Sequence, residues 1–517
     1  MKDSIFKITK RVLIAVVAVF MLQACDDGLT DINVNPTQAD QLDPELKFTR
    51  ALLQTSEGRF ESWRGNLIHA SSMIQHLSSL TTAWSGDRYT INTEYTGAFW
   101  NSLYPNAVKT IEDIIDQVQD EPEWVNLHSQ ARILRVFIYH RLTDFYGDIP
   151  YSEAGKGFIE GISNPVYDPQ EEIYKDMINE LTEAVAALTE GQMTFGSNDL
   201  LFAGDVEQWR RFGNSLKLRL GMRMSNVDPA AARAAVESAV NAPGGVMQSN
   251  ADIAWVNHAD QSGINRYGVG EVFHDFGLTG HNFALSDTFV GILIDEANNN
   301  ANIDPRLQHI GRVYNADGSV RTMDVMEYKG VPNGLQAAQI SNNWSLTDPD
   351  LQPYAMPNRE DMVNYDKPNI FQSYAEVRFL LAEAALRGWN VPGDAQTHYE
   401  AGIEAAMKHF ELYGLEITDT EISQYIANVA PADLEQIATQ KWIALFLNGY
   451  EAYAEWRRTG FPNLTPVNFP GNESNGQIPR RIIYPIQEPG NNRANYEAAV
   501  NRQGPDLFTT RMWWDVP

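Results

Sequence analysis

Residues 375–402 read AEVRFLLAEAALRGWNVPGDAQTHYEAG, and this stretch predicts two helices joined by a short turn. Apolar side chains recur at helical spacing up to Leu386, and Gly388 is well suited to end the first helix. Asp394 can begin the second helix, because its carboxylate can accept hydrogen bonds from backbone N–H groups of the first turn. The stretch therefore predicts a pair of consecutive helices.

The second helix of this pair carries small and aromatic residues at a characteristic spacing. Ala395, Tyr399 and Gly402 follow the small–aromatic–small order of the second helix in tetratricopeptide repeats, where small residues let paired helices approach closely. Helical periodicity recurs elsewhere in the chain. It predicts helices over residues 130–146, after the capping candidates Asp168 and Pro169, after the capping residue Asp205, and over residues 431–456.

The segments between these helical stretches have a different composition. Residues 241–367 are rich in Gly, Asn, Asp and Pro, and long irregular stretches of this kind usually form binding or packing loops. The tail from Thr459 is also rich in turn-forming residues. We therefore predict a mainly α fold, with helical repeats at about 45–226 and 372–458 and an irregular half at about 241–367 and 459–517.

The N-terminus has the layout of a bacterial export signal. Lys7, Lys10 and Arg11 precede an apolar run at residues 12–22, which is shorter than the roughly 20 residues that cross a bilayer as a helix. Cys25 follows and is the only cysteine in the chain, so lipidation after cleavage explains it better than an incidental cysteine behind an ordinary signal peptide. The predicted organisation is a signal peptide at residues 1–24, an acidic linker at 25–44 that starts at the lipidated Cys25, and one domain at 45–517.

Composition narrows the possible functions. The formal net charge is -28, and such a surface repels phosphate backbones, which argues against nucleic acid as a partner. The hydrophobic content of 43% with 11% aromatic residues is enough for a large core and argues against disorder. With one cysteine, a disulfide framework is excluded even though export is predicted.

Several strings occur in an order that resembles the SusD/RagB family of outer-membrane nutrient-binding lipoproteins, and its SusD-like branch in particular. Each string is a weak signal alone, but together they cover nearly all of the mature chain. They are NVNP at residues 33–36, DPRL at 304–307, YKGVP at 328–332, AEVRFLLAEA at 375–384 with Gly388 and Trp389 after it, QKWIAL at 440–445, GYE at 449–451, WRRTGFP at 456–462 and IPRRIIYP at 478–485.

The resemblance implies both a fold and a role. The expected fold has four tetratricopeptide-like helix pairs in a right-handed superhelix, packed against the irregular half. The expected role is that of a lid over a SusC-type TonB-dependent transporter in the outer membrane. The lid protein captures an oligosaccharide, or sometimes a peptide, and delivers it to the transporter. The resemblance also implies that Asp26, Asp27 and Asp31 favour display on the cell exterior, and that Arg457 and Arg458 anchor helix and loop carbonyls.

Sugar recognition needs flat aromatic faces with planar polar groups beside them. Two stretches have this mixture, although the alternative that Trp84 and Tyr89 only pack their loop stays open. If Trp84 contacts a ligand, Trp84→Ala should weaken binding with little effect on thermal stability. The candidates are Trp84, Asp87, Arg88, Tyr89, Asn92 and Tyr95 in the first stretch, and Asn342, Asn343, Trp344 and Tyr354 in the second.

We predict a binding protein rather than an enzyme, without a cofactor. The chain lacks a His-Glu-x-x-His motif and a Gly-x-Ser-x-Gly nucleophile elbow. The His274, Asp275, His281 and Asn282 region lacks a recognisable metal spacing, whereas residues 295–304 could either bind calcium or form a disordered turn rich in Asn. A glycoside hydrolase, which needs only two carboxylates, and a tetratricopeptide adaptor for protein partners are the alternatives.

Overall fold

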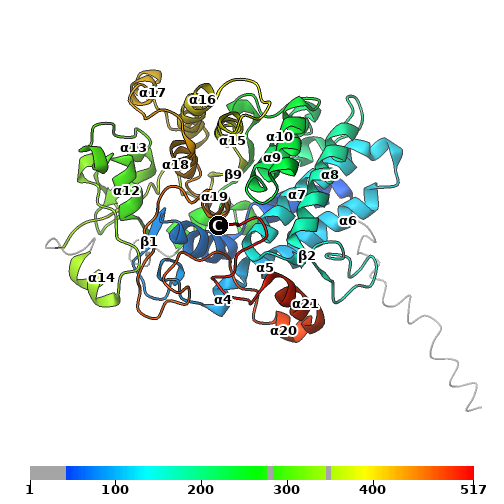
Figure 1. The fold of residues 1–517 in the computed structure, drawn as a ribbon, viewed down its shortest axis with the longest axis horizontal. Helices are drawn as coiled ribbons and strands as arrows, with labels where there is room; N and C mark the ends of the chain where they lie inside the picture. Colours follow the sequence, from blue (N-terminus) through cyan, green and yellow to red (C-terminus); the bar gives the residue numbers. More distant parts are fainter. Residues whose placement is uncertain (1–41, 276–282, 345–350) are drawn as a thin grey trace, which may run out of the picture. The chain divides into compact units, whose positions relative to one another are not determined.

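Helices build most of the unit formed by Pro44–Pro517 (Figure 1). The structure is a computed structural model that describes residues 42–275, 283–344 and 351–517. The predicted signal peptide, the lipidation site Cys25 and nearly all of the predicted linker lie outside these residues. Within them, no helix is both long enough and apolar enough to span a bilayer.

The first helical part runs from residue 44 to residue 241. Within it α7 packs against α8, α8 against α9 and α9 against α10. Its helices are α3 (Pro44–Thr55), η1 (Glu61–Ser71), η2 (Gly86–Arg88), α4 (Thr93–Thr96), α5 (Ala98–Leu103), η3 (Tyr104–Val108), α6 (Lys109–Val118), η4 (Pro122–Trp124), α7 (Val125–Tyr146), α8 (Gln170–Ala187), η5 (Gly196–Asn198), α9 (Val206–Arg223) and α10 (Pro229–Asn241).

The second helical part contains the helix pair that the 375–402 stretch predicts. The Asp394 carboxylate accepts a hydrogen bond from the backbone N–H of Thr397 at 2.9 Å, which confirms the predicted cap. A Cβ atom on Gly402 would lie 2.7 Å from the Phe379 ring, so only glycine allows the two helices to approach this closely. The helices are α15 (Tyr374–Leu386), α16 (Ala395–Lys408), η10 (His409–Tyr413), α17 (Asp419–Ile426), α18 (Leu434–Ala444) and α19 (Gly449–Thr459).

The remaining segments form short strands and short helices. Every strand pair is antiparallel: β1 (Leu77–Ser79) with β5 (Phe283–Leu285), β2 (Ile149–Pro150) with β3 (Tyr167–Asp168), β4 (Ala254–Asn257) with β9 (Pro368–Gln372), and β6 (Gly311–Tyr314) with both β7 (Val320–Thr322) and β8 (Ala355–Pro357). The helices here are η6 (Asn250–Asp252), η7 (Gly263–Asn265), α11 (Gly268–Asp275), α12 (Asp287–Leu293), η8 (Glu296–Asn298), α13 (Leu307–Ile310), η9 (Val325–Glu327), α14 (Ala337–Asn343), α20 (Glu488–Asn491) and α21 (Arg493–Gln503).

The predicted mainly α fold with an irregular, loop-rich part is therefore confirmed. The right-handed superhelix of four repeats stays a prediction. Several helices lie outside the predicted helical parts, and the two longest of them are α10 and α21. The first follows from local signals, because Asp228 accepts a hydrogen bond from the N–H of Ala231 and Pro229 occupies the first helical position.

Two local predictions in the helical parts need correction. Asp168 does not cap α8; its carboxylate accepts hydrogen bonds from the N–H groups of Tyr151 and Ser152 at 3.1 and 2.8 Å. The helix predicted at residues 431–456 is two helices, α18 and α19, because Leu447 has a φ of 71° in the turn between them. That break lets α18 and α19 take different directions.

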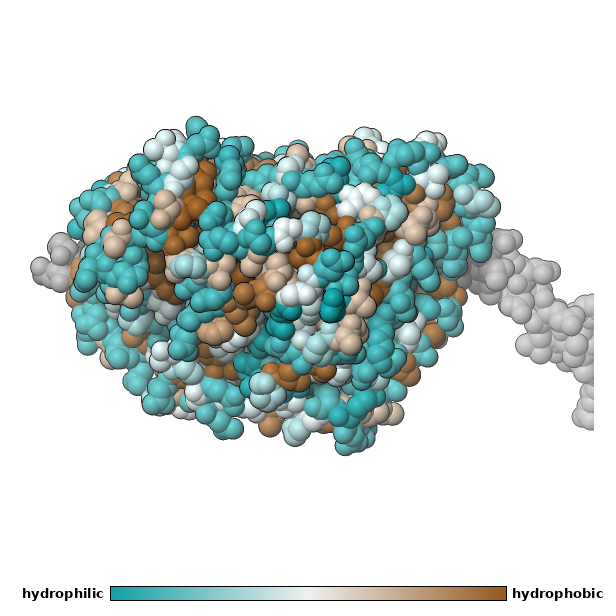
Figure 2. All heavy atoms as spheres, turned by 45° about the horizontal axis from the view of Figure 1, so that its top comes forward, coloured by the Kyte–Doolittle hydropathy of each residue, from teal (hydrophilic) through white to brown (hydrophobic). Residues whose placement is uncertain are grey.

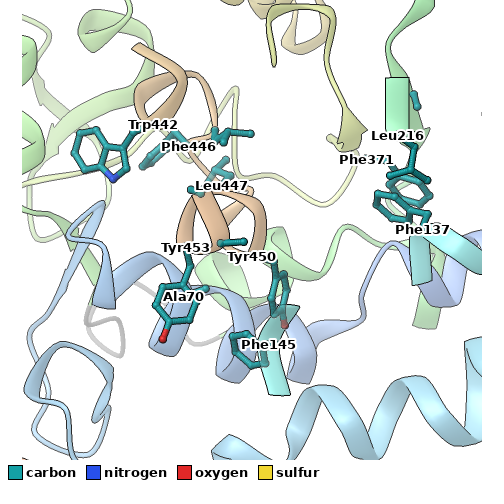
Figure 3. Close-up of a cluster of buried hydrophobic side chains, with 14 of the residues drawn as sticks. Ala70, Phe137, Phe145, Leu216, Phe371, Trp442, Phe446, Leu447, Tyr450 and Tyr453 are labelled. Atoms are coloured by element: carbon teal, nitrogen blue, oxygen red, sulfur yellow. The ribbon is translucent and has the colours of Figure 1, made fainter. Parts of the chain in front are cut away.

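Aromatic side chains from distant segments meet in the hydrophobic core. Figure 3 shows Tyr450 of α19 beside Phe145 of α7, with their ring centres 5.1 Å apart. Phe137 of α7 stacks on Phe371 of β9 at 4.4 Å with an angle of 9° between the ring planes. The core therefore joins the two helical parts through the strand that precedes α15.

A network of buried charged side chains lies between α7, α9, α15, α18 and α19. The Arg219 guanidinium contacts Glu376 at 2.6 Å, and Arg223 contacts Glu451 at 2.6 Å. Each member is at most 5% exposed. We call this set the buried charge network; it consists of Asp144, Arg219, Arg223, Glu376, Glu383, Lys441, Glu451, Glu455 and Arg458.

The network lowers the pKa of three of its buried carboxyl groups, those of Glu383, Glu451 and Glu455. Burial alone would raise the pKa of Glu451, but Arg223, Arg219 and Lys441 outweigh burial and lower that pKa to about 2. Arg458 contacts Glu383 and Glu455 at 2.5 Å each, so it binds carboxylates where the family resemblance implies carbonyls. Arg457 meets that expectation, since it donates to the backbone carbonyls of Asp144, Tyr453 and Arg480.

Hydrophilic residues predominate on the surface. Figure 2 shows one face on which they surround separate patches of hydrophobic residues. This distribution fits the acidic composition of the chain, because the excess of carboxylates can remain hydrated at the surface.

We predict that Arg458→Met destabilises the fold. The substitution leaves the carboxylates of Glu383 and Glu455 buried without this partner, and breaking a buried ion pair from one side costs about 3–5 kcal/mol. Urea unfolding of the chain that starts after Cys25 should show a decrease of this size in the free energy of unfolding.

Arg233→Met is the matched control. Arg233 forms an exposed i,i+4 pair with Glu237, so its removal should cost less than about 1 kcal/mol. Glu383 and Glu455 have folded pKa values below the ordinary 4.5, so their ionised forms stabilise the fold above that pH and this contribution is lost as pH falls. The effect of Arg458→Met should therefore shrink below pH 4.5, and an effect equal to that of Arg233→Met at neutral pH would contradict the prediction.

Candidate functional site

Three aromatic side chains surround one guanidinium at the surface, and we call these four residues the aromatic–arginine cluster: Phe60, Trp63, Arg64 and Tyr95. The Arg64 guanidinium carbon lies 4.9, 5.1 and 5.0 Å from the ring centres of Phe60, Trp63 and Tyr95. Phe60 is 53% exposed, and the other three are half-buried. The cluster therefore presents flat apolar faces to solvent around a cation.

Two short segments position the cluster. Trp63 and Arg64 lie in the first turn of η1, whose backbone hydrogen bonds have the wide spacing of a π-helix, a form often found at functional sites. Tyr95 lies in α4, which Asn92 caps by accepting hydrogen bonds from the N–H groups of Glu94 and Tyr95 at 3.1 and 3.2 Å. The Glu94 carboxylate accepts from Arg64 at 2.7 Å. Asn92 and Glu94 thus hold Tyr95 against Arg64.

Trp84 supports the cluster from the protein interior. It is 6% exposed, and its ring centre lies 5.8 Å from that of Trp63 in an edge-to-face arrangement. On its other side Trp84 lies 4.4 Å from the ring of Phe283, in β5. Trp84 therefore connects the cluster to the core and keeps the Trp63 ring in place.

Charged and aromatic residues continue the surface toward α11, which packs against η1. Arg59 donates to the Asp275 carboxylate at 2.9 Å, and the Tyr365 hydroxyl donates to the same carboxylate at 2.8 Å. Arg266 lies over the Tyr365 ring at 4.1 Å. Burial, together with the hydrogen bond to Asp275, raises the pKa of Tyr365 to about 12. The Asp275 carboxylate thus holds both Arg59 and Tyr365 in place at this surface.

Three arginines of this surface are each paired with a carboxylate. Arg64 pairs with Glu94 at 2.7 Å and Arg59 with Asp275 at 2.9 Å. Arg266 pairs in the same way with Asp260 at 2.9 Å. A surface with paired charges favours a neutral ligand over a strongly charged one.

The predicted ligand residues Asp87, Arg88 and Tyr89 are buried, with at most 1% of each exposed. The Asp87 carboxylate accepts hydrogen bonds from the backbone N–H groups of Ser79 at 3.0 Å and Gly334 at 3.3 Å. Burial raises the pKa of Asp87. Because a ligand in solvent cannot reach these side chains, the prediction that they contact it directly needs correction.

Arg88 and Tyr89 connect separate loops of the irregular part. Arg88 donates to the Leu335 carbonyl at 2.8 and 2.9 Å. The Tyr89 hydroxyl accepts from the N–H of Val467 at 3.2 Å, and the Tyr89 carbonyl accepts from the N–H of Glu473 at 2.8 Å. The segment therefore joins the loops at residues 332–335 and 465–474. The sequence analysis assigned these polar groups to a ligand, but they form hydrogen bonds with the loops instead.

The second group of predicted ligand residues lies around α14. Asn343 is exposed at the end of this helix and Trp344, directly after it, is half-buried. Tyr354 is 7% exposed, and burial raises its pKa to about 12. Asn343 and Trp344 are therefore accessible candidates, whereas Tyr354 packs beside β8.

Sequence reasoning found Tyr95 and Asn92 but missed Phe60, Trp63 and Arg64. The latter three follow the i, i+3, i+4 spacing of a helix, which is the spacing expected for a buried face. An arginine next to two aromatic residues on such a face was the signal that could have identified them.

The positions considered for a metal are used within the protein. Among the described residues, no group of three or more His, Cys, Asp or Glu side chains is arranged to hold a metal ion. The Asp295 carboxylate accepts from the N–H of Asn302 at 2.9 Å, and Asp304 is paired with Arg306. His281 and Asn282 lie outside the described residues.

Comparison with known proteins gives one family and several solved structures. The family described as "Starch-binding associating with outer membrane", SusD-like, matches residues 36–485. A chitin-binding protein of known structure is 31% identical, with a TM-score of 0.79 over 92% of this chain and 100% of that chain. The Bacteroidetes AC2a SusD-like structure is 29% identical, with a TM-score of 0.80 over 92% and 100% of the two chains.

A chitin-binding SusD homologue from Flavobacterium johnsoniae is 27% identical, with a TM-score of 0.75 over 92% of this chain and 99% of that chain. No curated protein matches the sequence.

We predict that Trp84→Ala lowers stability, in contrast to the expectation from sequence. Removing a buried tryptophan costs about 3–5 kcal/mol, and here it also removes the contacts with Trp63 and Phe283. Urea unfolding measures the change. Phe60→Ala serves as the control, because its exposed ring should contribute less than about 1 kcal/mol; equal stability of Trp84→Ala and wild type would show that Trp84 is not part of the core.

Proposed function

The chain belongs to the SusD-like family of starch-binding proteins that associate with the outer membrane, and from this premise we propose that it captures a neutral nutrient oligosaccharide at the cell surface. The aromatic–arginine cluster is the observation that supports this proposal most directly. A pyranose ring has an apolar face that stacks on aromatic rings, and its hydroxyls accept and donate hydrogen bonds at the edge.

The cluster offers both kinds of contact. Phe60 is accessible as a stacking face, and Tyr95 is held beside it through Arg64. Arg64 and Glu94 are placed to form hydrogen bonds with hydroxyls next to the stacked ring. Rigid aromatic rings lose little conformational entropy on binding, so a few of them can supply much of the affinity.

Two related structures carry the name chitin-binding, and this suggests the first ligand to test. Chitin oligomers are neutral and carry both hydroxyl and amide groups, which suits a surface with paired charges. We therefore propose β-linked N-acetylglucosamine oligomers as the leading ligand class, ahead of peptides.

The proposal includes an anchor and a partner. In it, Cys25 carries a lipid that attaches the chain to the outer membrane, and a SusC-type TonB-dependent transporter receives the captured oligosaccharide. The protein would act by binding alone. Around the cluster, the carboxylates of Glu94 and Asp275 are committed to ion pairs with Arg64 and Arg59, which is not the arrangement of a general acid.

Phe60→Ala should weaken binding of chitohexaose roughly tenfold, which corresponds to about 1.4 kcal/mol. Calorimetric titration of the soluble chain that starts after Cys25 measures the dissociation constant, with analysis of the products in each sample. We expect weaker binding because the substitution removes an exposed stacking face, and we expect the fold to stay intact because the ring is not buried.

Met326→Ala is the control, because Met326 is 50% exposed on η9 and should change the dissociation constant less than about twofold. Binding of peptides in place of sugars would contradict the ligand class. Cleaved sugar would contradict the claim that the protein is not an enzyme, and unchanged affinity of Phe60→Ala would remove the cluster from the site.

Cys25→Ala should release the protein from membranes while the domain stays folded. The anchor in this proposal is a lipid on Cys25, so its loss leaves only the soluble domain. Fractionation of cells that express the variant, followed by detection of the protein, measures attachment. A variant that remains in the outer-membrane fraction would contradict lipidation at Cys25.

A further inference from the structure

A pocket with aromatic walls is lined by none of the residues of the buried charge network or the aromatic–arginine cluster. It has a volume of about 400 Å³ and is bounded by α5 and η3 on one side and by α20 and the loop at residues 154–165 on the other. We call it the Phe158 pocket. Its lining includes Trp100, Tyr104 and Phe158, together with the polar residues Asn164, Glu488 and Asn491.

Phe158 is the most exposed large hydrophobic side chain described, at 88%. It lies in the loop after β2, and the Lys109 ammonium is 4.3 Å from its ring centre. A phenylalanine kept at the surface leaves apolar area in water that burial would stabilise. Contact between this ring and a ligand would remove that area from water.

The floor of the pocket is a set of packed aromatic rings. Trp100 is 6% exposed, and its ring centre lies 4.5 Å from that of Tyr104. Trp100 also stacks on Tyr167 at 5.8 Å, and the Tyr104 hydroxyl donates to the Pro150 carbonyl at 2.7 Å. The floor therefore keeps its shape without a ligand.

Hydrogen bonds hold the polar wall in place. The Asn164 amide donates to the Asn491 carbonyl at 2.7 Å, and the Asn492 amide donates to the Pro165 carbonyl at 2.7 Å. The Tyr167 hydroxyl donates to Glu488, whose pKa is raised by burial. The end of the 154–165 loop that contains Asn164 is thus tied to α20, and Phe158 lies earlier in the same loop.

The charges of the pocket indicate the ligand. Lys109 and Glu488 are of opposite sign, and the other polar lining residues are neutral, with the amides of Asn164, Asn491 and Asn492 and the hydroxyls of Tyr104 and Ser163. Aromatic faces beside planar amides suit a pyranose with hydroxyl or acetamido groups, and one cation and one carboxyl group in the same lining favour a ligand without net charge.

We infer that the Phe158 pocket is a second binding site for a neutral oligosaccharide, independent of the aromatic–arginine cluster; this rests on the proposed function and names an additional site for the same class of ligand. Two sites on one chain would hold separate segments of a long polysaccharide. The gain in retention would then come from multivalency rather than from stronger contacts at either site.

The test is calorimetric titration of chitotriose into wild type, Phe158→Ala, Phe60→Ala and the double variant. Wild type should bind two molecules per chain. Phe158→Ala should lose binding at the Phe158 pocket and keep binding at the aromatic–arginine cluster. Phe60→Ala should lose binding at the cluster and keep binding at the pocket, and the double variant should show neither. Phe158→Leu keeps apolar volume without a flat ring and should restore only part of the lost binding.

Tryptophan fluorescence gives an independent readout, because Trp100 lines the pocket. In Phe60→Ala the ligand should still change the emission, and in the double variant it should not. If Phe60→Ala abolishes all binding and Phe158→Ala has no effect, the second site is excluded while the proposed function stands. If wild type binds no neutral oligosaccharide, both proposals fail.

Discussion

The buried charge network constrains the rest of the structure. Apolar surfaces alone allow helices to slide and rotate against one another, because hydrophobic contact has little directionality. The ion pairs of Arg223 fix the positions of Asp144 on α7 and Glu451 on α19. The ion pair of Arg458 fixes the position of Glu383 on α15. Burying these charges is costly unless all partners are present, so the network favours one arrangement of the five helices over nearby alternatives.

The network is also connected to the proposed ligand surface through the turn between α18 and α19. The amide of Asn66, in η1, donates to the Leu447 carbonyl at 2.9 Å, and its oxygen accepts from the N–H of Gly449 at 3.0 Å. A Cβ on Gly449 would lie 2.4 Å from that oxygen, so the close approach needs glycine. Because η1 carries Trp63 and Arg64, the helices that hold the network also position the aromatic–arginine cluster.

The surface residues proposed for ligand binding lie at helix ends and in loops on this rigid scaffold. Such positions can change from one protein to another without loss of the buried contacts, which is why related folds can bind different ligands. Phe60 and Phe158 illustrate the arrangement, since both are exposed. Behind Phe60 the buried Trp84 packs against Trp63, and the buried Trp100 belongs to the floor of the Phe158 pocket.

Local order in the sequence determined much of the fold. Helical periodicity, the caps at Asp205 and Asp394 and the small residue Gly402 depend on residues close in the chain, so they could be read directly. Five of the nine charged residues of the network lie in the strings that resemble the family, but the strings do not show the pairing, because it joins residues far apart in the chain, such as Arg223 and Glu451.

Only the tertiary structure decided which polar and aromatic groups reach solvent. Asp87, Arg88 and Tyr89 have the composition of a sugar site, yet backbone groups from distant loops take up their hydrogen bonds. Trp63 and Arg64 have the spacing of a core helix, yet they lie at the surface beside Tyr95. Burial depends on what the rest of the chain places over a residue, and a local pattern carries no information about those distant segments.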